Sequence, residues 1–306
     1  MTACLLIVGP TAAGKTALAL AAARRLDGEI VNADSMQIYA GLPLITAQPS
    51  ASDQARAPHH LFGHVDPAER WSVGHWAEAA MAQITAIQAR GRTAIIVGGT
   101  GLYFHALTKG LAPVPEIDPQ ARARVEALIV SEGLKGLHRE ALRLDPQATG
   151  RVKPTDRQRL TRIAEVGYST GQSLSSFQVE TRPLLPQDAW RGIVIEPDRQ
   201  ALYDRINRRF SQMLAEGALD EVRAFAALGL DPTLPASKAL GVPPLMAHLR
   251  GELSLEDSVT LATRDSRRYA KRQMTWSRNQ YPDWGRVHAL DATAAEIELD
   301  VLLGAP

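Results

Sequence analysis

The eight residues Gly9–Thr16, "GPTAAGKT", constrain the fold of this chain more than any other segment. They match G-x-x-x-x-G-K-[ST], the pattern of a phosphate-binding loop. The apolar run "CLLIV" precedes the loop, and an Ala/Leu-rich segment, 16–26, follows it. The loop therefore stands between a predicted buried strand and a predicted helix, where backbone N–H groups and the helix N-terminus attract phosphate oxygens. The sequence does not say whose phosphate is bound.

Two further apolar segments extend the pattern into a parallel sheet. "EIVNADS" (29–35) and "TAIIVGGTG" (93–101) are typical of strands, and a predicted helix over 72–91 separates them. A strand–helix–strand–helix–strand order predicts parallel strands with helices on both faces. Since ligands of such sheets bind at the carboxyl ends of the strands, we expect the loop, Asp34–Ser35 and Gly98–Gly101 to meet there.

The middle of the chain changes character at a proline-rich segment. Pro113, Pro115 and Pro119 mark a linker, 120–178 has only helical patterns, and "RGIVIEPD" (191–198) resumes a strand. We therefore predict an α/β fold with a P-loop NTPase-like parallel core. Residues 1–112 and 188–306 would form this core, and 113–187 an inserted α-helical domain.

Net charge, cysteine content and apolar runs exclude several classes of protein. The 306 residues carry a formal net charge of +1, so any polyanion site must arise from local clustering. One cysteine, Cys4, excludes an internal disulfide and a Cys-rich zinc site. The N-terminus lacks a signal-peptide pattern, and no apolar run approaches the ~20 residues that span a bilayer. We expect a cytoplasmic protein without a membrane segment.

The motif residues suggest phosphate chemistry with a donor other than ATP. Lys15 supplies a charge and the Thr16 hydroxyl suits Mg²⁺. Asp34 could cap a turn, bind metal or accept a proton from a nucleophile. Many ATPases have an Asp where "AIIVGGTG" has two glycines, and such glycines suggest close approach of backbone to ligand.

Two basic clusters suggest a nucleic acid. The segment 264–278 contains six Lys or Arg residues with Tyr269 and Trp276 between them, and 151–162 contains five. Basic residues with aromatics suit a phosphate backbone and stacked bases, although solvated helix faces look the same. "APHHLFGH" carries His59, His60 and His64, for which a structural or substrate-loop role is favoured over zinc.

Together these segments resemble the tRNA dimethylallyltransferases, also called tRNA isopentenyl-transferases. The resemblance covers nearly the whole chain and rests on "GPTAAGKT", "NADSMQIYAGLPLITAQPS", "APHHLFGHVDP", "IIVGGTGLYFHAL", "LYDRINRRFSQML" and "RRYAKRQMTWSRN". It implies transfer of a dimethylallyl group from dimethylallyl diphosphate to the exocyclic amine of the adenosine 3′-adjacent to the anticodon. The alternatives are an AMP prenyltransferase of the cytokinin type, a P-loop small-molecule kinase and a non-catalytic RNA-binding protein.

The resemblance also implies site residues. Asp34 matches the general base, Thr100 a contact to the target nucleotide, Thr16 the Mg²⁺ group and Arg209 a second diphosphate-binding cation. The implied diphosphate-binding residues are Gly9, Pro10, Thr11, Ala12, Ala13, Gly14, Lys15, Thr16 and Arg209. The implied tRNA-binding residues are Asp34, Ser35, Met36, Gln37, Thr100, Arg122, Gln158, Arg159, Leu160, Thr161, Arg162, Lys238, Lys271, Arg272, Gln273, Trp276 and Arg278.

The expected partners are the tRNA anticodon stem-loop and dimethylallyl diphosphate, and the expected state is a monomer. With one cysteine, the chain resembles bacterial members, because eukaryotic ones often add a zinc finger. One departure is clear: Gly241–Val242–Pro243 replaces the Gly-Tyr-Arg of many members.

Overall fold

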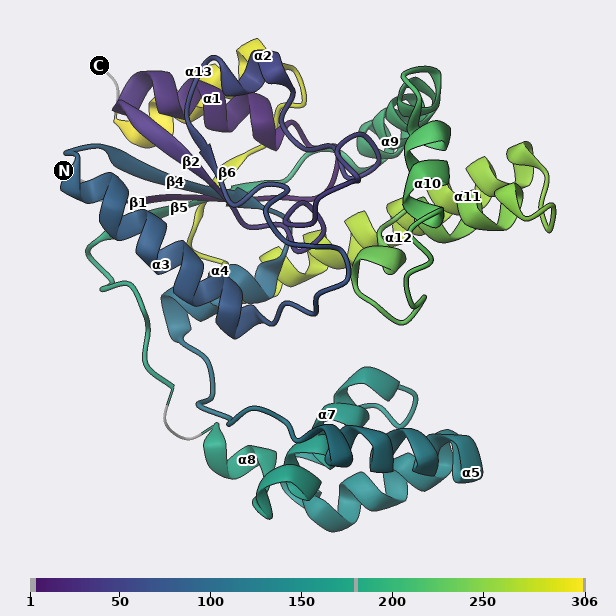
Figure 1. Cartoon of the computed structure of the whole chain (residues 1–306). Coiled ribbons are helices and arrows are strands. Elements are labelled where there is room, and N and C mark those ends of the chain that lie inside the picture. The colour runs from purple at the N-terminus through teal and green to yellow at the C-terminus, as the bar shows by residue number, and fades with distance from the viewer. Residues whose placement is uncertain (1–3, 179–180, 305–306) are drawn as a thin grey trace. The chain divides into compact units, whose positions relative to one another are not determined.

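A computed structural model describes residues 4–178 and 181–304 (Figure 1). The chain divides into two compact units, which we describe separately. One comprises Met1–Thr108 with Leu184–Pro306, and the other comprises Lys109–Pro183. The domain limits expected from the sequence, 112/113 and 187/188, each lie four residues beyond these bounds.

The first unit contains a parallel sheet, as the sequence predicts, and the sheet has six strands. Its strand order is β3-β2-β4-β1-β5-β6, and every pairing is parallel. The strands are β1 Cys4–Val8, β2 Gly28–Asn32, β3 His59–His60, β4 Thr93–Gly98, β5 Trp190–Ile195 and β6 Gly285–Val287. β1 and β2 are buried along their whole length, which explains apolar runs without alternation.

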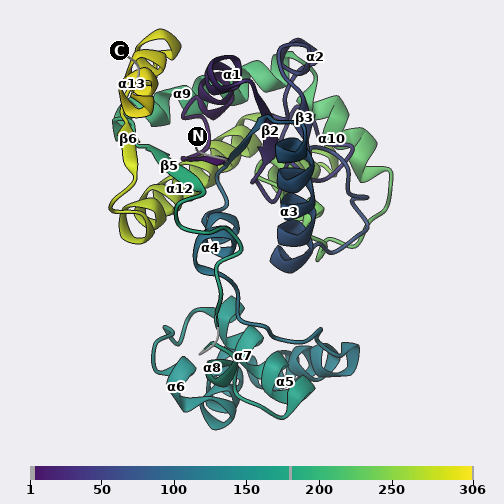
Figure 2. The same cartoon turned by 90° about the vertical axis from the view of Figure 1, so that its left-hand side faces the viewer.

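Helices cover both faces of the sheet. α1 and α13 lie on one face, and α3 and α4 lie on the other (Figures 1 and 2). The helices before the insertion are α1 Lys15–Leu26, α2 Ala51–Gln54, α3 Val73–Ala89 and α4 Gly101–Lys109. Those after it are α9 Arg199–Ala215, α10 Ala218–Ala226, η1 Ala236–Lys238, α11 Val242–Leu249, α12 Leu255–Gln280 and α13 Ala292–Leu303.

The strand register brings the predicted site segments to one edge. Val8 pairs with Gly98, and Asn32 pairs with Val97, so β1, β2 and β4 end at the same level. The phosphate loop after β1, Asp34 after β2 and Thr100 after β4 therefore leave the sheet side by side.

The second unit is helical and has its own core. It contains α5 Pro119–Leu144, α6 Pro146–Thr149, α7 Arg157–Thr170 and α8 Leu174–Phe177. Val125, Leu137, Leu160 and Ile163 are buried together in its core. α5 is interrupted at Gly133, whose φ of 63° lies in the left-handed region that glycine tolerates.

Among the helices of residues 4–178 and 181–304, none has the length and apolar character needed to cross a membrane.

Candidate active site

The phosphate loop has the backbone shape needed to surround an anion. Ala12 (φ 64°) and Gly14 (φ 87°) both lie in the left-handed region, and α1 begins at Lys15 directly afterwards. Gly9 donates its N–H to the carbonyl of Gly98 at 3.2 Å, which fastens the start of the loop to β4. The N-terminus of α1 thus faces the space that the loop encloses.

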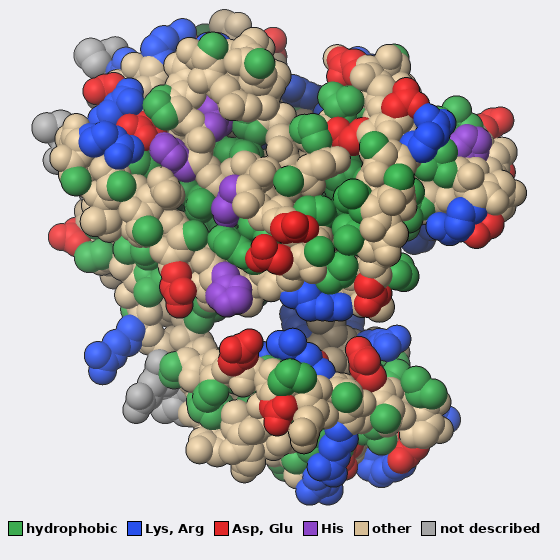
Figure 3. All heavy atoms as spheres, in the orientation of Figure 1, with side chains coloured by type: hydrophobic (Ala, Val, Ile, Leu, Met, Phe, Trp, Pro, Cys, Tyr) green, Lys and Arg blue, Asp and Glu red, His purple; other side chains and the backbone are tan. Residues whose placement is uncertain are grey.

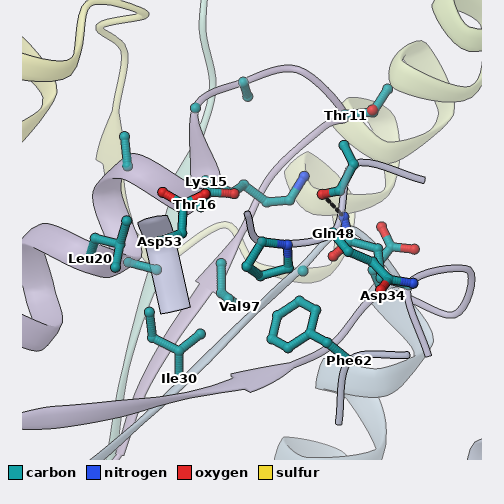
Figure 4. A pocket seen from close by; sticks show the side chains of 18 of the residues that line it. Thr11, Lys15, Thr16, Leu20, Ile30, Asp34, Gln48, Asp53, Phe62 and Val97 are labelled. Carbon is teal, nitrogen blue, oxygen red and sulfur yellow. Dashed lines mark hydrogen bonds between the residues drawn. The ribbon is translucent and has the colours of Figure 1, made fainter. Parts of the chain in front are cut away.

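Lys15 is positioned as the loop cation. Its Nζ donates to the carbonyl of Pro10 at 2.9 Å, which folds the side chain back over the loop. Burial is the main cause that lowers the Lys15 pKa to about 8, while Asp34 opposes the shift and Arg209 adds to it. Thr16 is exposed beside Lys15 and lines the same cavity (Figure 4).

Arg209 reaches the loop from α9. Its Nη2 donates to the hydroxyl of Thr11 at 2.7 Å. Burial, with a smaller contribution from nearby Arg205, lowers the Arg209 pKa to about 10, and Asp34 counteracts it. Two cations thus face one loop, a charge distribution that a bound anion would stabilise.

Asp34 sits in a turn that Asn32 fixes. Asn32 is wholly buried; its Oδ1 accepts from the Asp34 N–H at 2.8 Å, and its Nδ2 donates to the Asp34 carbonyl at 3.0 Å. One carboxylate oxygen of Asp34 accepts the N–H of Met36 at 3.0 Å. Asp34 therefore caps a turn and also lines the cavity, so the two readings of this residue are compatible.

Thr100 is tied to the same turn. Its Oγ1 accepts the N–H of Ser35 at 2.9 Å and donates to Ser35 Oγ at 3.3 Å. The Tyr269 phenol, from α12, also hydrogen-bonds to Thr100, and burial together with Asp34 raises the Tyr269 pKa. Asp34, Thr100 and Tyr269 consequently form one group at the ends of β2 and β4.

The glycines at the end of β4 lie against protein atoms on the side where a Cβ would point. A Cβ on Gly98 would lie 2.0 Å from the carbonyl oxygen of Ala33, and one on Gly99 would lie 2.1 Å from Nε2 of Gln273. A Cβ on Gly101 would lie 2.2 Å from the Trp276 ring. Protein atoms fill the position that each Cβ would take, which explains the need for glycine here. Gly98 also lines the cavity beside the phosphate loop, and close approach of its backbone to a ligand stays a prediction.

These segments enclose a cavity of about 400 Å³. Figure 4 shows Lys15, Thr16 and Asp34 with an apolar side made by Leu20, Ile30, Val97 and Phe62. A second cavity of about 60 Å³ shares Thr11, Asp34, Thr46 and Arg209 with the first. Its other lining residues are mostly apolar or aromatic: Met36, Ile45, Ile206, Phe210, Met213, Leu240, Ser266 and Tyr269. Arg209, Thr11, Asp34 and Thr46 therefore lie where a larger polar cavity adjoins a smaller, more apolar one.

Comparison with known proteins identifies the family. The profile of the IPP transferase family matches residues 37–280. The tRNA dimethylallyltransferase of Maricaulis maris is 65% identical over 306 residues, which cover 100% of this chain and 99% of that protein. The chain belongs to the IPP transferase family.

Solved structures of IPP transferases agree with this fold. The tRNA isopentenylpyrophosphate transferase from Bacillus halodurans is 34% identical with a TM-score of 0.68, covering 98% of this chain and 96% of that one. A eukaryotic dimethylallyltransferase acting on tRNA has a TM-score of 0.82 at 24% identity, covering 99% and 80%, which shows the fold alone.

The sequence-predicted tRNA-binding residues of this IPP transferase fall into two groups. Most have exposed or half-buried side chains: Ser35, Met36, Gln37, Arg122, Gln158, Arg159, Thr161, Arg162, Lys238, Lys271, Arg272, Trp276 and Arg278. Leu160 is 0% exposed and Gln273 is 6% exposed. Both side chains point into the protein, so we remove them from the expected tRNA-contact surface. Gln37 uses its Nε2 to hold the carbonyls of Thr46 and Ala47.

The histidines of "APHHLFGH" are held by protein groups. His59 Nδ1 bonds the carbonyl of Ala57 at 2.8 Å, and His60 Nε2 bonds Glu29 at 2.7 Å. Within the described residues, no three His, Cys, Asp or Glu side chains group as a metal site. His59 and Phe62 instead line the larger cavity of this IPP transferase.

Three residues that position the site were missed. Asn32 could have been found as a polar residue inside an apolar strand. Tyr269 stood among the basic residues of α12 and was read as part of a surface. The Glu221 carboxylate accepts the N–H groups of Leu44 and Ile45 at 2.8 Å each, which fixes the loop beside the smaller cavity. No sequence pattern pointed to Glu221.

Proposed function

We propose that this protein transfers a dimethylallyl group from dimethylallyl diphosphate to the exocyclic amine of the adenosine 3′-adjacent to the anticodon in tRNA, with release of diphosphate. One observation carries the proposal: Asp34 and Arg209 both line two adjoining cavities, of which the larger contains the phosphate loop. A base and a leaving-group cation thus adjoin the space in which two substrates could meet.

The donor fits the larger cavity. Its diphosphate would lie against the loop N–H groups, Lys15 and Arg209, which stabilise negative charge as the leaving group departs. We place the adenine on the side of the smaller cavity, whose lining includes Met36, Phe210 and Tyr269. The target base must leave the anticodon loop stack to enter, at a cost of a few kcal/mol.

The chemical step balances within these groups. The exocyclic nitrogen attacks C1 of the dimethylallyl group, the C1–O bond breaks, and diphosphate leaves. Asp34 accepts the proton that the amine loses, since only one of its two carboxylate oxygens accepts a hydrogen bond within the turn. Met36 N–H holds the other oxygen and so orients the carboxylate.

We propose Mg²⁺ as the metal. Mg²⁺ is usually held by one or two protein oxygens together with substrate phosphates, and the exposed Thr16 hydroxyl at the cavity fits such a site. When bound, it would neutralise part of the diphosphate charge.

The tRNA would be held by local basic surfaces. Figure 3 shows basic and acidic side chains interspersed over the face in view, in agreement with the net charge of +1. On α12, Arg268, Lys271 and Arg272 are exposed, and on α7 Arg157, Arg159 and Arg162 are exposed. A tRNA substrate would place the reaction in the cytoplasm, and we propose that the protein acts as a monomer. Size-exclusion chromatography tests the latter.

The experiment offers dimethylallyl diphosphate, and separately ATP, with unmodified tRNA or AMP. We expect tRNA, and not AMP, to gain the mass of one dimethylallyl group. The gain should require dimethylallyl diphosphate and should not occur with ATP. Gain on AMP would favour the cytokinin-type alternative, and phosphate transfer from ATP would favour a kinase. Chelation of divalent metal should abolish transfer, and added Mg²⁺ should restore it.

A further inference from the structure

We propose that Gln273 is a positioning residue for the diphosphate site and not a tRNA contact. This inference rests on the proposed function, because it concerns the leaving group of that reaction. Gln273 belongs to α12, the helix whose outer face carries Lys271 and Arg272, yet its own side chain faces the phosphate loop.

Both ends of the Gln273 amide are used. Oε1 accepts the N–H of Thr11 at 2.9 Å, and Nε2 donates to the carbonyl of Gly99 at 2.9 Å. The side chain is 6% exposed, and its approach to β4 requires the absence of a Cβ at Gly99. The amide therefore bridges the phosphate loop and the end of β4, two segments far apart in the sequence.

The bridge continues to the second cation. Gln273 holds the backbone N–H of Thr11. The hydroxyl of the same Thr11 accepts a hydrogen bond from the Arg209 guanidinium at 2.7 Å. Arg209 is half-buried near Arg205, so their repulsion works against its present position. An immobile Thr11 gives Arg209 a fixed acceptor, and we infer that Gln273 acts on the leaving group through Thr11 and Arg209.

An amide is suited to this position because its NH2 group donates and its carbonyl accepts, and the Tyr269 phenol also hydrogen-bonds to this side chain. A protonated carboxyl also offers a donor and an acceptor, whereas a carboxylate offers acceptors only. In Gln273→Glu, burial and the facing Gly99 carbonyl raise the pKa of the new carboxyl group, whereas the Thr11 N–H opposes this shift. This variant should therefore lose the bridge at high pH and regain it as the pH falls.

The test compares Gln273→Met, Gln273→Glu and a matched control, Gln200→Met. Gln200 is an exposed glutamine of α9 whose Nε2 donates to Asp204 of its own helix at 3.1 Å. In Gln273→Met we expect inorganic diphosphate to bind about tenfold more weakly, the loss that one well-placed hydrogen bond explains. Dimethylallyl diphosphate should show a raised KM and tRNA an unchanged Kd. The control should match wild type throughout.

In Gln273→Glu, the kcat/KM for the donor relative to wild type should rise as the pH falls from about 8 to about 6. Dividing by the wild-type value removes the pH dependence that both proteins share. A ratio that stays flat with pH, or a fall in tRNA affinity with unchanged diphosphate binding, overturns the inference. Should Gln273→Met not fold, the pH series of Gln273→Glu carries the test. Absence of prenyl transfer by wild type, with intact effects on inorganic diphosphate binding, would instead refute the proposed function.

Discussion

The guanidinium of Arg209 donates to the hydroxyl of Thr11 at 2.7 Å across 198 positions of sequence. This contact joins α9 to the phosphate loop and supplies the loop with a cation that its own motif does not contain. Lys15 is the cation of the motif itself, and its Nζ donates to the carbonyl of Pro10. The leaving-group site is consequently assembled from two distant parts of the chain.

Arg209→Lys tests the geometry of this cation. Lysine keeps the charge but cannot hold Thr11 and also present a second N–H to a phosphate in a fixed fork. We expect the donor KM to rise about tenfold or more, with tRNA affinity unchanged. Arg208→Lys, an exposed neighbour on α9, is the matched control. Wild-type kinetics in Arg209→Lys would mean that charge alone matters.

Lys15 gives the donor affinity a dependence on pH. Because burial lowers the Lys15 pKa to about 8, the free protein loses this charge as the pH rises through that value. We expect inorganic diphosphate to bind more weakly above pH ~8, while Lys15→Arg, which stays charged, should lack this decline. Titration calorimetry at several pH values measures both. An equal decline in the two proteins would assign the effect to another group.

Asp34→Asn tests the general base. Asparagine keeps an oxygen for the N–H of Met36, so the turn should survive. We expect a single-turnover rate lowered by ~10²–10⁴ with both substrates still bound, the usual range for a lost general base. Rapid-quench transfer of the dimethylallyl group gives this rate. Unchanged chemistry with weaker tRNA binding would make Asp34 a contact residue.

The ion pairs of Glu29 should make the free energy of unfolding depend on pH in acid. This buried carboxylate of β2 pairs with Arg90, Arg92 and His60, and its hydrogen bond to Arg90 is the main cause that lowers its pKa from 4.5 to about 2. A carboxyl with a depressed folded pKa stabilises the fold above its unfolded pKa and loses that contribution as the pH falls from 4.5 towards 2.

Glu29→Gln should therefore lower the free energy of unfolding by about 2 kcal/mol at pH 7, and the difference from wild type should vanish as the pH falls towards about 2. Urea unfolding at a series of pH values measures it. Glu132→Gln, which removes an exposed partner of Arg139, is the control with little expected effect. A pH-independent difference would point to lost packing.

The sequence predicted those site residues that directly follow a strand of the parallel sheet. Strand ends of a parallel sheet lie at one edge, so the grouping of Lys15, Asp34 and Thr100 could be predicted from three apolar runs. The contact from Arg209 could not be derived that way, because helical spacing says which face a residue occupies and not what lies opposite.

The buried side chains of α7 and α12 follow a helical spacing that can be recognised in the sequence. Ala270, Gln273, Met274 and Ser277 are buried at spacings of three, four and seven, the stripe of an amphipathic helix. Leu160 belongs to a similar stripe with Ile163, Ala164 and Gly167. Residue spacing could therefore have separated Leu160 and Gln273 from their exposed neighbours, whereas the hydrogen bonds of Gln273 needed the structure.

The exposed cations of α7 and α12 carry the last prediction. Replacing Arg157, Arg159 and Arg162 together by Ala, or Arg268, Lys271 and Arg272 together, removes three positive charges from one surface. Each phosphate contact releases counterions, so each triple variant should bind tRNA more weakly. Its salt dependence should also be flatter, by about one unit of slope or less per lost contact. Inorganic diphosphate should bind as in wild type, because the loop and Arg209 are untouched.

Filter-binding titrations at several salt concentrations measure these slopes. The control replaces three exposed arginines that pair with acids elsewhere, Arg139, Arg223 and Arg250. It removes the same total charge, so a drop confined to the α7 and α12 variants would assign the effect to local contacts and not to net charge. Equal affinities and slopes in all variants would make both basic faces merely solvated. Transfer to AMP would then be the reaction to test next, since that alternative needs no tRNA surface.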